Sequence, residues 1–404
     1  MSRVTHSPAA LWLAVAVIAA TPLDAARAAD AGPPTKLPPV RAKAQIATYS
    51  ELVFRNYQDA YNAARNLQNA VDEFVSNVGD DSDEELQSVR QAWLDSRMSY
   101  GESEAFRFYE GPIDFGKRPD GSVGPETMLN GWPVNESYID YVEGQPSAGI
   151  INDGSIPITR ETLVERNARD DEADITTGFH AIEFLLWGQD LDANGPGHRP
   201  ARDFIGGGVH ERRRAYLKVA TDLLVDQLHG LVEAWAPNGR NYRAELAAMD
   251  PRKSVAKILT GIATLSGFEL AFERLATALD SGSQEDEHSC FSDTTHIDVL
   301  ANAIGVANVY FGRYGDFSGS GISTLVKAAN PQLNQLLEDQ IAKSVALARA
   351  IDHPFDKTLR TPPGSPERAK VEALVTSLQT QARLLKAAGA ALGVEIVVTT
   401  EVEN

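Results

Sequence analysis

The chain has 404 residues and carries 37 Lys and Arg against 56 Asp and Glu, a formal net charge of −19 at pH 7. Such an excess of negative charge opposes binding to phosphate backbones and anionic lipid, so we expect no nucleic-acid partner. It suits either solubility alone or the gathering of cations. The only cysteine is Cys290, which excludes an internal disulfide.

The first 28 residues have the pattern of a secretory signal peptide. An apolar stretch from Ala9 to Ala20 precedes Ala26-Arg27-Ala28, the small-x-small pattern that signal peptidase cleaves. The stretch holds about a dozen residues, short of the ~20 that span a bilayer, and no later stretch is apolar for that long. We therefore expect export to the periplasm or cell envelope, with no transmembrane span in the mature chain. An uncleaved signal anchor is the alternative.

The remaining chain reads as a series of helices. Four prolines and no helical period predict an extended linker over 29–43. Apolar residues recur at three- and four-residue spacing in several later segments, which predicts amphipathic helices over 46–78, 83–108, 160–169, 175–187, 209–235, 254–279, 294–311, 322–351 and 366–391. Frequent Gly, Pro and aromatic residues predict a long ordered excursion over 110–157.

This pattern predicts an all-α protein with two helical-bundle domains. The chain is longer than one hydrophobic core usually serves, and the Gly- and Pro-rich run 194–197 suggests a boundary near residue 200. We expect domains at 44–200 and 201–393, then a tail or short strand over 394–404. A similar layout of apolar residues in the two halves is consistent with duplication, although chance similarity between amphipathic helices would produce the same pattern.

One predicted helix carries two ionisable residues in apolar surroundings. The segment 178–188 is apolar on every side except at His180 and Glu183, so this helix should be buried. Residues three apart on an α-helix project about 60° apart, close enough to bind one ion. A buried carboxylate needs a cation, a hydrogen-bond donor or a proton. The pair could therefore be a metal site, as in helical bundles that bind iron or manganese, or a hydrogen bond inside the core.

The same segment resembles a known family signature. Gly178-Phe-His-Ala-Ile-Glu-Phe-Leu-Leu-Trp-Gly188 is similar to the Gly-x-His-x-x-Glu signature of the imelysin family, and similar stretches occur at 97–114, 129–141 and 286–314. The resemblance covers about 50–390. It implies a two-domain helical-bundle protein of the bacterial envelope, tied to iron acquisition and also classed as a metallopeptidase. It carries over Gly178 as the motif glycine and His180 and Glu183 as metal ligands, with iron favoured and zinc as the other candidate.

Other polar residues in the matching stretches are expected to contribute to the same cleft. These residues are Glu104, Arg107, Asp114, Glu136 and Asp140. Helix caps and structural ion pairs are the alternative roles for them.

The peptidase function requires more than the signature supplies. Zinc peptidases of the His-Glu-x-x-His type have two histidines one turn apart and an adjacent glutamate. Here Ala181 and Phe184 occupy those positions, so a base and further ligands would have to come from residues such as Glu104, Glu136 or Glu269. No catalytic residue is identified.

We therefore favour a binding function over proteolysis. The expected activity is binding of a metal ion or an iron-bearing ligand in an inter-helical cleft, in association with envelope iron-transport components. The alternative is a zinc-dependent metallopeptidase that acts on exported polypeptides.

The polar segment 285–296 is a second place where a metal could bind. One thiol, Cys290, and two histidines, His288 and His296, could ligate zinc. We favour the interpretation that Cys290 is buried as a small apolar residue and that Ser292 or Asp293 caps the following helix.

Overall fold

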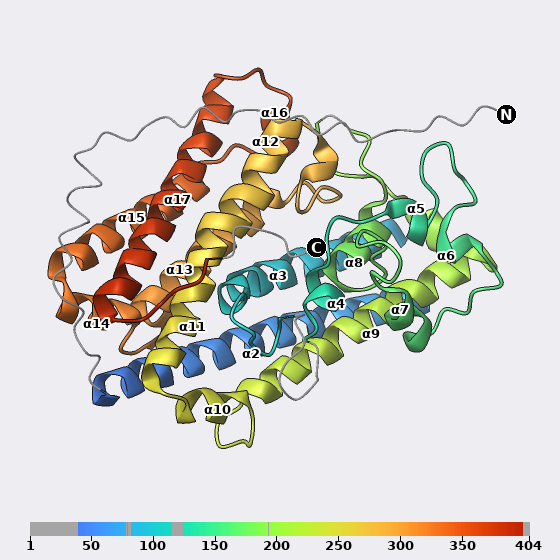
Figure 1. Ribbon diagram of the computed structural model, residues 1–404. Coiled ribbons are helices and arrows are strands. Elements are labelled where there is room, and N and C mark those ends of the chain that lie inside the picture. The colour runs from blue at the N-terminus through green and yellow to red at the C-terminus, as the bar shows by residue number, and fades with distance from the viewer. Residues whose placement is uncertain (1–38, 78, 80–81, 115–123, 193, 399–404) are drawn as a thin grey trace.

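The structure is a computed structural model that describes residues 39–77, 79, 82–114, 124–192 and 194–398. The prediction of an all-α fold is confirmed, because helices make up almost all of the regular structure in these residues (Figure 1). The strands there are two dipeptides, β1 (Arg313–Tyr314) and β2 (Phe317–Ser318), paired antiparallel with Arg313 opposite Ser318. The predicted signal peptide lies outside the described residues, as does the end of the tail.

The helices follow the predicted order closely. The longer ones are α2 (Pro39–Asn77), α3 (Ser82–Glu102), α9 (Val209–Trp235), α11 (Pro251–Thr264), the π-helix η3 (Leu265–Ala276), α13 (Thr295–Phe311), α14 (Ile322–Ala329), α15 (Pro331–Arg349) and α17 (Pro366–Leu392). The shorter ones are η1 (Ser103–Phe106), α4 (Glu126–Asn130), α5 (Glu136–Ile139), α6 (Gly149–Asn152), α7 (Arg160–Arg166), α8 (Gly178–Trp187), η2 (Ala201–Phe204), α10 (Tyr242–Ala248), α12 (Thr277–Ser281), η4 (Gln284–Asp286) and α16 (Phe355–Leu359).

Some boundaries differ from the prediction for local reasons. Helix α2 begins at Pro39, inside the predicted linker, because proline is tolerated in the first turn of a helix. The predicted helix over 322–351 is two helices. Asn330 has an extended backbone and its side chain accepts a hydrogen bond from the Leu333 amide, while Pro331 occupies the first turn of α15. Proline there lacks the amide hydrogen that would continue α14, so one helix ends and the next begins.

Two groups of helices share one hydrophobic core. Helix α2 packs along α3 and α9, and α17 packs against α15 and η3, with α13 in contact with both α3 and α15 (Figure 1). The buried apolar residues form one contiguous cluster through both groups. Helix α9, which follows residue 200, packs on α2, which precedes it; the two-domain division at that residue stays a prediction.

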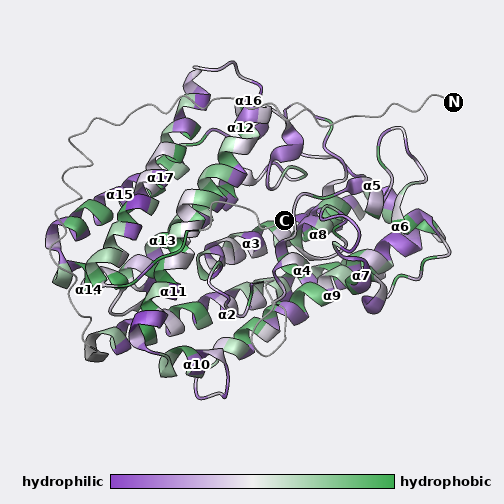
Figure 2. Ribbon diagram, viewed as in Figure 1, coloured by the Kyte–Doolittle hydropathy of each residue, from purple (hydrophilic) through white to green (hydrophobic). Residues whose placement is uncertain are grey.

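The helix from Pro251 to Ser281 runs continuously through α11, η3 and α12. It has 31 residues and is long and apolar enough to cross a membrane, contrary to the expectation that no stretch after the signal peptide is apolar for that length. In its most apolar window 61% of the residues are buried, and it packs along α17. Such burial is typical of the core helix of a bundle. By contrast, polar and apolar residues alternate along α2 and α9 (Figure 2).

The predicted excursion over 110–157 is largely ordered short structure. Its described part contains α4, α5 and α6, and α4 packs against both α8 and α9. All residues of α8 are buried, as its apolar sequence predicted. The excursion and the loop before α13 therefore enclose the helix that carries the signature.

Candidate ligand-binding site at His180 and His288

The signature glycine allows α8 to pack directly against α4. Gly178 is the first residue of α8 and has a φ of +85°, a conformation that residues with a side chain rarely adopt. A Cβ atom at this position would lie 2.5 Å from the carbonyl oxygen of Leu129 at the end of α4. Both the backbone conformation and the close approach therefore require glycine, and together they set where His180 lies.

His180 and Glu183 are hydrogen-bonded to each other inside the core. The distance from His180 Nδ1 to Glu183 Oε2 is 2.9 Å, and both side chains have no solvent exposure. The other oxygen, Glu183 Oε1, accepts hydrogen bonds from the amide and the hydroxyl of Ser292 at 2.9 and 2.6 Å. Both carboxyl oxygens therefore have partners, as the core hydrogen-bond alternative expects.

Burial makes this pair neutral at pH 7. Burial raises the pKa of Glu183 to about 8, although the hydrogen bonds from Ser292 and the charge of Arg97 lower it. Burial, together with the positive charge of Arg97, holds the pKa of His180 well below its ordinary value. Burial thus disfavours the charged form of both groups, so they do not form a pair of opposite charges.

A positive charge does lie beside His180, and it belongs to Arg97. Its Nη2 is 3.4 Å from His180 Nε2 and 3.3 Å from His288 Nδ1. The buried guanidinium is held by Asp298 through contacts of 3.0 Å from Nε and 3.1 Å from Nη2. Its Nη1 donates to Asn130 Oδ1 at 2.6 Å. Such a two-point arginine–carboxylate contact orients the guanidinium firmly.

His288 is a second histidine oriented by a carboxylate. Its Nδ1 is 2.8 Å from Asp298 Oδ2, and its ring centroid is 4.7 Å from that of His180. Burial raises the pKa of Asp298, but Arg97 and the hydrogen bond from His288 outweigh it and hold the pKa far below its usual range. Burial and the charge of Arg274 lower the pKa of His288 to about 4. His288 is thus neutral at pH 7, and its contacts with Asp298 and Arg97 both involve Nδ1.

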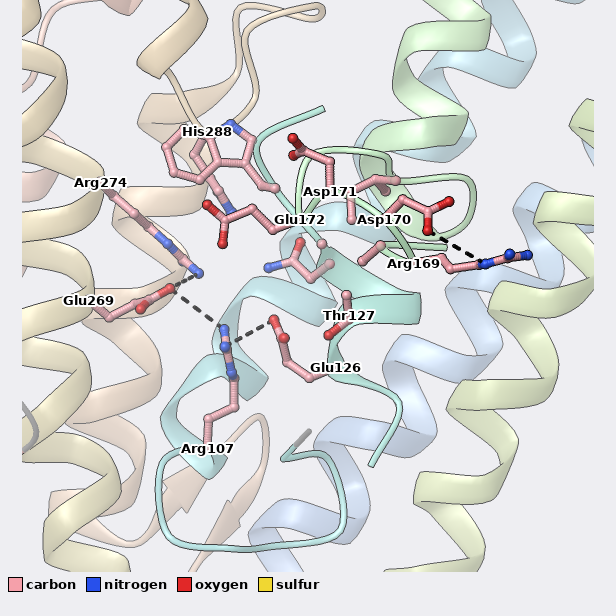
Figure 3. Close-up of a pocket in the computed structure, with 15 residues that line it drawn as sticks. Arg107, Glu126, Thr127, Arg169, Asp170, Asp171, Glu172, Glu269, Arg274 and His288 are labelled. Atoms are coloured by element: carbon pink, nitrogen blue, oxygen red, sulfur yellow. Dashed lines mark hydrogen bonds and ion pairs between the residues drawn. The ribbon is translucent and has the colours of Figure 1, made fainter. Parts of the chain in front are cut away.

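His288 forms part of the wall of a polar pocket of about 420 Å³ (Figure 3). The pocket lies between α4, η3, the loop after α7 and the loop that carries His288. Its charged and imidazole-bearing lining residues are Arg107, Glu126, Arg169, Asp170, Asp171, Glu172, Glu269, Arg274 and His288. The pocket therefore offers both carboxylates and guanidinium groups to a ligand.

Ion pairs organise one wall of this pocket. Arg107 lies 2.9 Å from Glu126 and 3.7 Å from Glu269, and Arg274 lies 2.9 Å from Glu269 (Figure 3). Beneath them, the buried Glu104 accepts 2.6 Å contacts from both arginines. Burial raises the pKa of Glu104, but the two guanidinium charges dominate and lower it to about 2.

The other predicted cleft residues do not line this pocket. Asp114 accepts hydrogen bonds from the amides of Phe108, Tyr109 and Gly111, so it shapes its own loop. Asp140 is buried against two arginines that lie away from the pocket, Arg199 at 2.9 Å and Arg213 at 2.6 Å.

Glu136 is also outside the pocket. Its Oε2 accepts from Gln189 Nε2 at 2.6 Å. Burial, followed by the charge of Glu285, raises the pKa of Glu136 to about 7. These three carboxyls fit the alternative role of structural contacts, because each is bonded to partners that do not line the pocket.

Sequence reasoning missed the residues that surround His180. Arg97 lies on α3, where the sequence suggests an ordinary surface charge. Asp298 lies in the first turn of α13, where an acidic residue is common. His288 belongs to the polar segment 285–296, for which the sequence offers a zinc site but favours a capping loop. Cys290 is buried as expected, but Ser292 bonds Glu183, and the residue before α13, Thr294, makes no side-chain cap. The capping role was therefore wrong.

The side chains around His180 do not form a finished metal centre. Among the described residues, no group of three or more His, Cys, Asp or Glu side chains is arranged to hold a metal ion. Glu183 has no free oxygen, and the Arg97 guanidinium contacts His180 Nε2. As placed, the pair does not fit a metal ion bound directly between His180 and Glu183.

The fold and site define an all-helical protein in which one histidine, His288, lines a polar pocket and a second, His180, packs against it. The chain belongs to the imelysin family, whose model matches residues 53–385. It is similar in fold to an iron-regulated protein A precursor from Parabacteroides distasonis, with a TM-score of 0.70, 20% identity, and coverage of 89% of this chain and 96% of that one. An imelysin-like protein from Psychrobacter arcticum gives a TM-score of 0.60 at 15% identity, covering 90% and 99%. No curated protein matches the chain significantly.

Proposed function

We propose that this protein is an exported, iron-linked binding protein that takes an iron ion or a small iron chelate in the pocket at His288. The observation that carries the proposal is the orientation of His288. Asp298 holds its Nδ1 at 2.8 Å, so Nε2 is available on a pocket wall that also presents Glu126 and Glu269. Histidines that ligate metals usually have the other ring nitrogen engaged by a carboxylate in this way.

In this proposal His180 and Glu183 support His288 and are not the first ligands of the iron. The Arg97 guanidinium would have to move before a metal ion reached His180 Nε2, whereas His288 can be reached from the pocket without that movement. We therefore place His288 first in the ligand set. His180 packs against the His288 ring, and Glu183 orients His180. The signature residues His180 and Glu183 then help to hold His288 in its position in the pocket wall.

The lining of the pocket favours iron in a chelate over a bare ion. Arg107 and Arg274 contribute positive charge that would oppose a free cation, but guanidinium groups bind carboxylates well. Glu126, Glu269 and Glu172 supply oxygen donors, which suit a hard cation. Association with iron is consistent with the description of the Parabacteroides protein as iron-regulated. The signal-peptide pattern of residues 1–28 supports export to the periplasm, where envelope iron-transport components would be its partners.

The test is metal binding by the purified protein. Ferrous iron under anaerobic conditions, ferric citrate and zinc are titrated separately by calorimetry, and bound metal is measured by elemental analysis. We expect ferric citrate to bind most tightly, and His288→Gln to weaken its binding at least ~10-fold, the lower end of the effect seen for metal-site residues. The matched control is His198→Gln, because His198 is exposed and does not line this pocket.

Two results would contradict the proposal. One is a protein that takes up neither iron nor zinc in any form. The other is iron binding that His288→Gln leaves unchanged. Cleavage of an unfolded polypeptide that a chelator stops would instead support the zinc-dependent peptidase alternative.

A further inference from the structure

The two buried arginines in the pocket wall differ in how fully the protein engages them. Arg274 is only 3% exposed. Its Nη1 donates to Asn302 Oδ1 at 2.7 Å, and its Nη2 contacts Glu104 at 2.6 Å and Glu269 at 2.9 Å. Both terminal nitrogens of Arg274 therefore have partners that lie within the wall itself.

Arg107 is anchored at one terminal nitrogen and meets a pocket-lining carboxylate with the other. Its Nη1 donates to the buried Glu104 at 2.6 Å, and its guanidinium lies 4.7 Å from the ring centroid of Phe108. Its Nη2 is 2.9 Å from Glu126 Oε1 (Figure 3). Arg107 and Glu126 both line the pocket and are 11% and 17% exposed. A ligand in the pocket can therefore reach this ion pair.

The contact between Arg107 and Glu126 can be exchanged without disturbing the rest of the wall. Because Nη1 stays bonded to Glu104, Arg107 keeps its position and its counter-charge when Nη2 changes partner. A largely buried guanidinium without a partner is costly, so Glu126 stabilises the ligand-free pocket. A carboxylate of the ligand would make the same charge-assisted contact. Glu126 and that carboxylate are thus alternatives for one place.

We propose that Nη2 of Arg107 binds a carboxylate of the ligand, and that Glu126 occupies this place until the ligand arrives. The ligand is therefore a carboxylate-bearing acid, and Arg107, not Arg274, is the residue that binds it. The proposal rests on the proposed function only in placing the ligand in this pocket. After the exchange, Glu126 is a free carboxylate on the pocket wall.

This exchange would let the pocket distinguish a metal-loaded chelate from the empty acid. An empty acid must break the Arg107–Glu126 contact and leaves Glu126 without a partner, so it should bind weakly. In an iron chelate the metal can accept the displaced Glu126, because carboxylate oxygens suit a hard cation. Glu126 therefore acts as an internal competitor that selects for the loaded form.

The experiment measures binding of metal-free citrate to the full chain by calorimetry, with trace metal removed beforehand. Glu126→Ala should bind citrate at least ~10-fold more tightly than the native chain, the size expected for one charged hydrogen-bonding contact. The matched control is Glu172→Ala. Glu172 is an exposed carboxylate of the same pocket and is not one of the carboxylates paired with Arg107, so its removal should give a much smaller gain.

A second substitution tests whether the gain depends on Arg107. Lysine has a single ammonium that can remain with Glu104 but lacks the second nitrogen of the guanidinium. Arg107→Lys combined with Glu126→Ala should therefore lose the gain, while thermal unfolding confirms that the variant is folded. The proposal would be overturned by no gain in Glu126→Ala, by an equal gain in Glu172→Ala, or by a gain that survives Arg107→Lys.

Ferric citrate, titrated in parallel, separates this proposal from the iron-binding function. If the native chain does not bind ferric citrate but Glu126→Ala gains citrate, the iron proposal fails and the Arg107 assignment stands. If the native chain binds ferric citrate and Glu126→Ala gains nothing for citrate, the Arg107 assignment fails and iron binding stands.

Discussion

Arg97 places a permanent positive charge 3.4 Å from Nε2 of His180. The signature histidine therefore faces a cation that the protein itself supplies. Because the guanidinium is buried and is balanced by Asp298, neither group can be removed alone without leaving an unpaired charge in the core. This relationship makes the site a rigid, charge-balanced platform behind the pocket.

Arg97→Met should destabilise the protein by about 3–5 kcal/mol, because Asp298 would remain buried without its partner. Adding Asp298→Leu should recover much of that loss, since the double variant leaves no buried charge. Urea unfolding of the two single variants and the double variant gives the coupling energy. Additive losses in the double variant would show that the two residues do not act as a pair.

Ser292→Ala should cost about 1–3 kcal/mol, because Glu183 Oε1 would lose the 2.6 Å hydrogen bond from the hydroxyl in a fully buried place. The amide of Ser292 would remain as a donor, so helical content should not change. Thermal unfolding is the measurement. Ser155→Ala is the control, because Ser155 makes a similar bond to Asp153 on the exposed surface and its loss should have little effect.

Gly178→Ala should destabilise the fold by about 1–3 kcal/mol or more, through backbone strain and the approach of Cβ to the Leu129 carbonyl oxygen at 2.5 Å. It should also weaken ligand binding, since α8 would move away from α4. The matched control is Gly230→Ala in α9, where a Cβ would meet nothing within 4 Å. That change should stabilise the helix by up to ~1 kcal/mol. Equal effects at the two glycines would contradict the argument.

The ionised Glu104 should contribute stability that disappears in acid. Its folded pKa, about 2, is lower than its ordinary value, so its contribution is complete above about pH 5 and is lost as the pH falls toward 2. Relative to Glu104→Gln, the native chain should gain on the order of 3 kcal/mol at pH 6. That difference should shrink steadily below pH 4. Denaturant unfolding of both proteins across this range tests it; a difference independent of pH would contradict the role of the Arg107 and Arg274 charges.

The order and extent of the helices could be predicted from the sequence. Apolar spacing along α2, α9, α13 and α17 reports directly which face is buried, and that local pattern is enough to define an amphipathic helix. The break at Asn330 was missed, although its cause is local, because the apolar period continues through it.

The signature segment also shows which features a local sequence pattern can predict and which it cannot. Its apolar composition predicted that α8 would be buried, and His180 and Glu183 do lie together on it. Their separation of one helical turn is a local property of the chain. Whether that pair meets a metal, a donor or another charge depends on what lies opposite.

Only the tertiary structure decided that question. Arg97, Asp298 and His288 come from α3, α13 and a loop, and no spacing in the sequence records that they meet at His180 or that the charges of Arg97 and Asp298 cancel there. Local periodicity determines helices because their contacts are short-range, whereas a site depends on long-range packing that brings separate charges into one low-dielectric region.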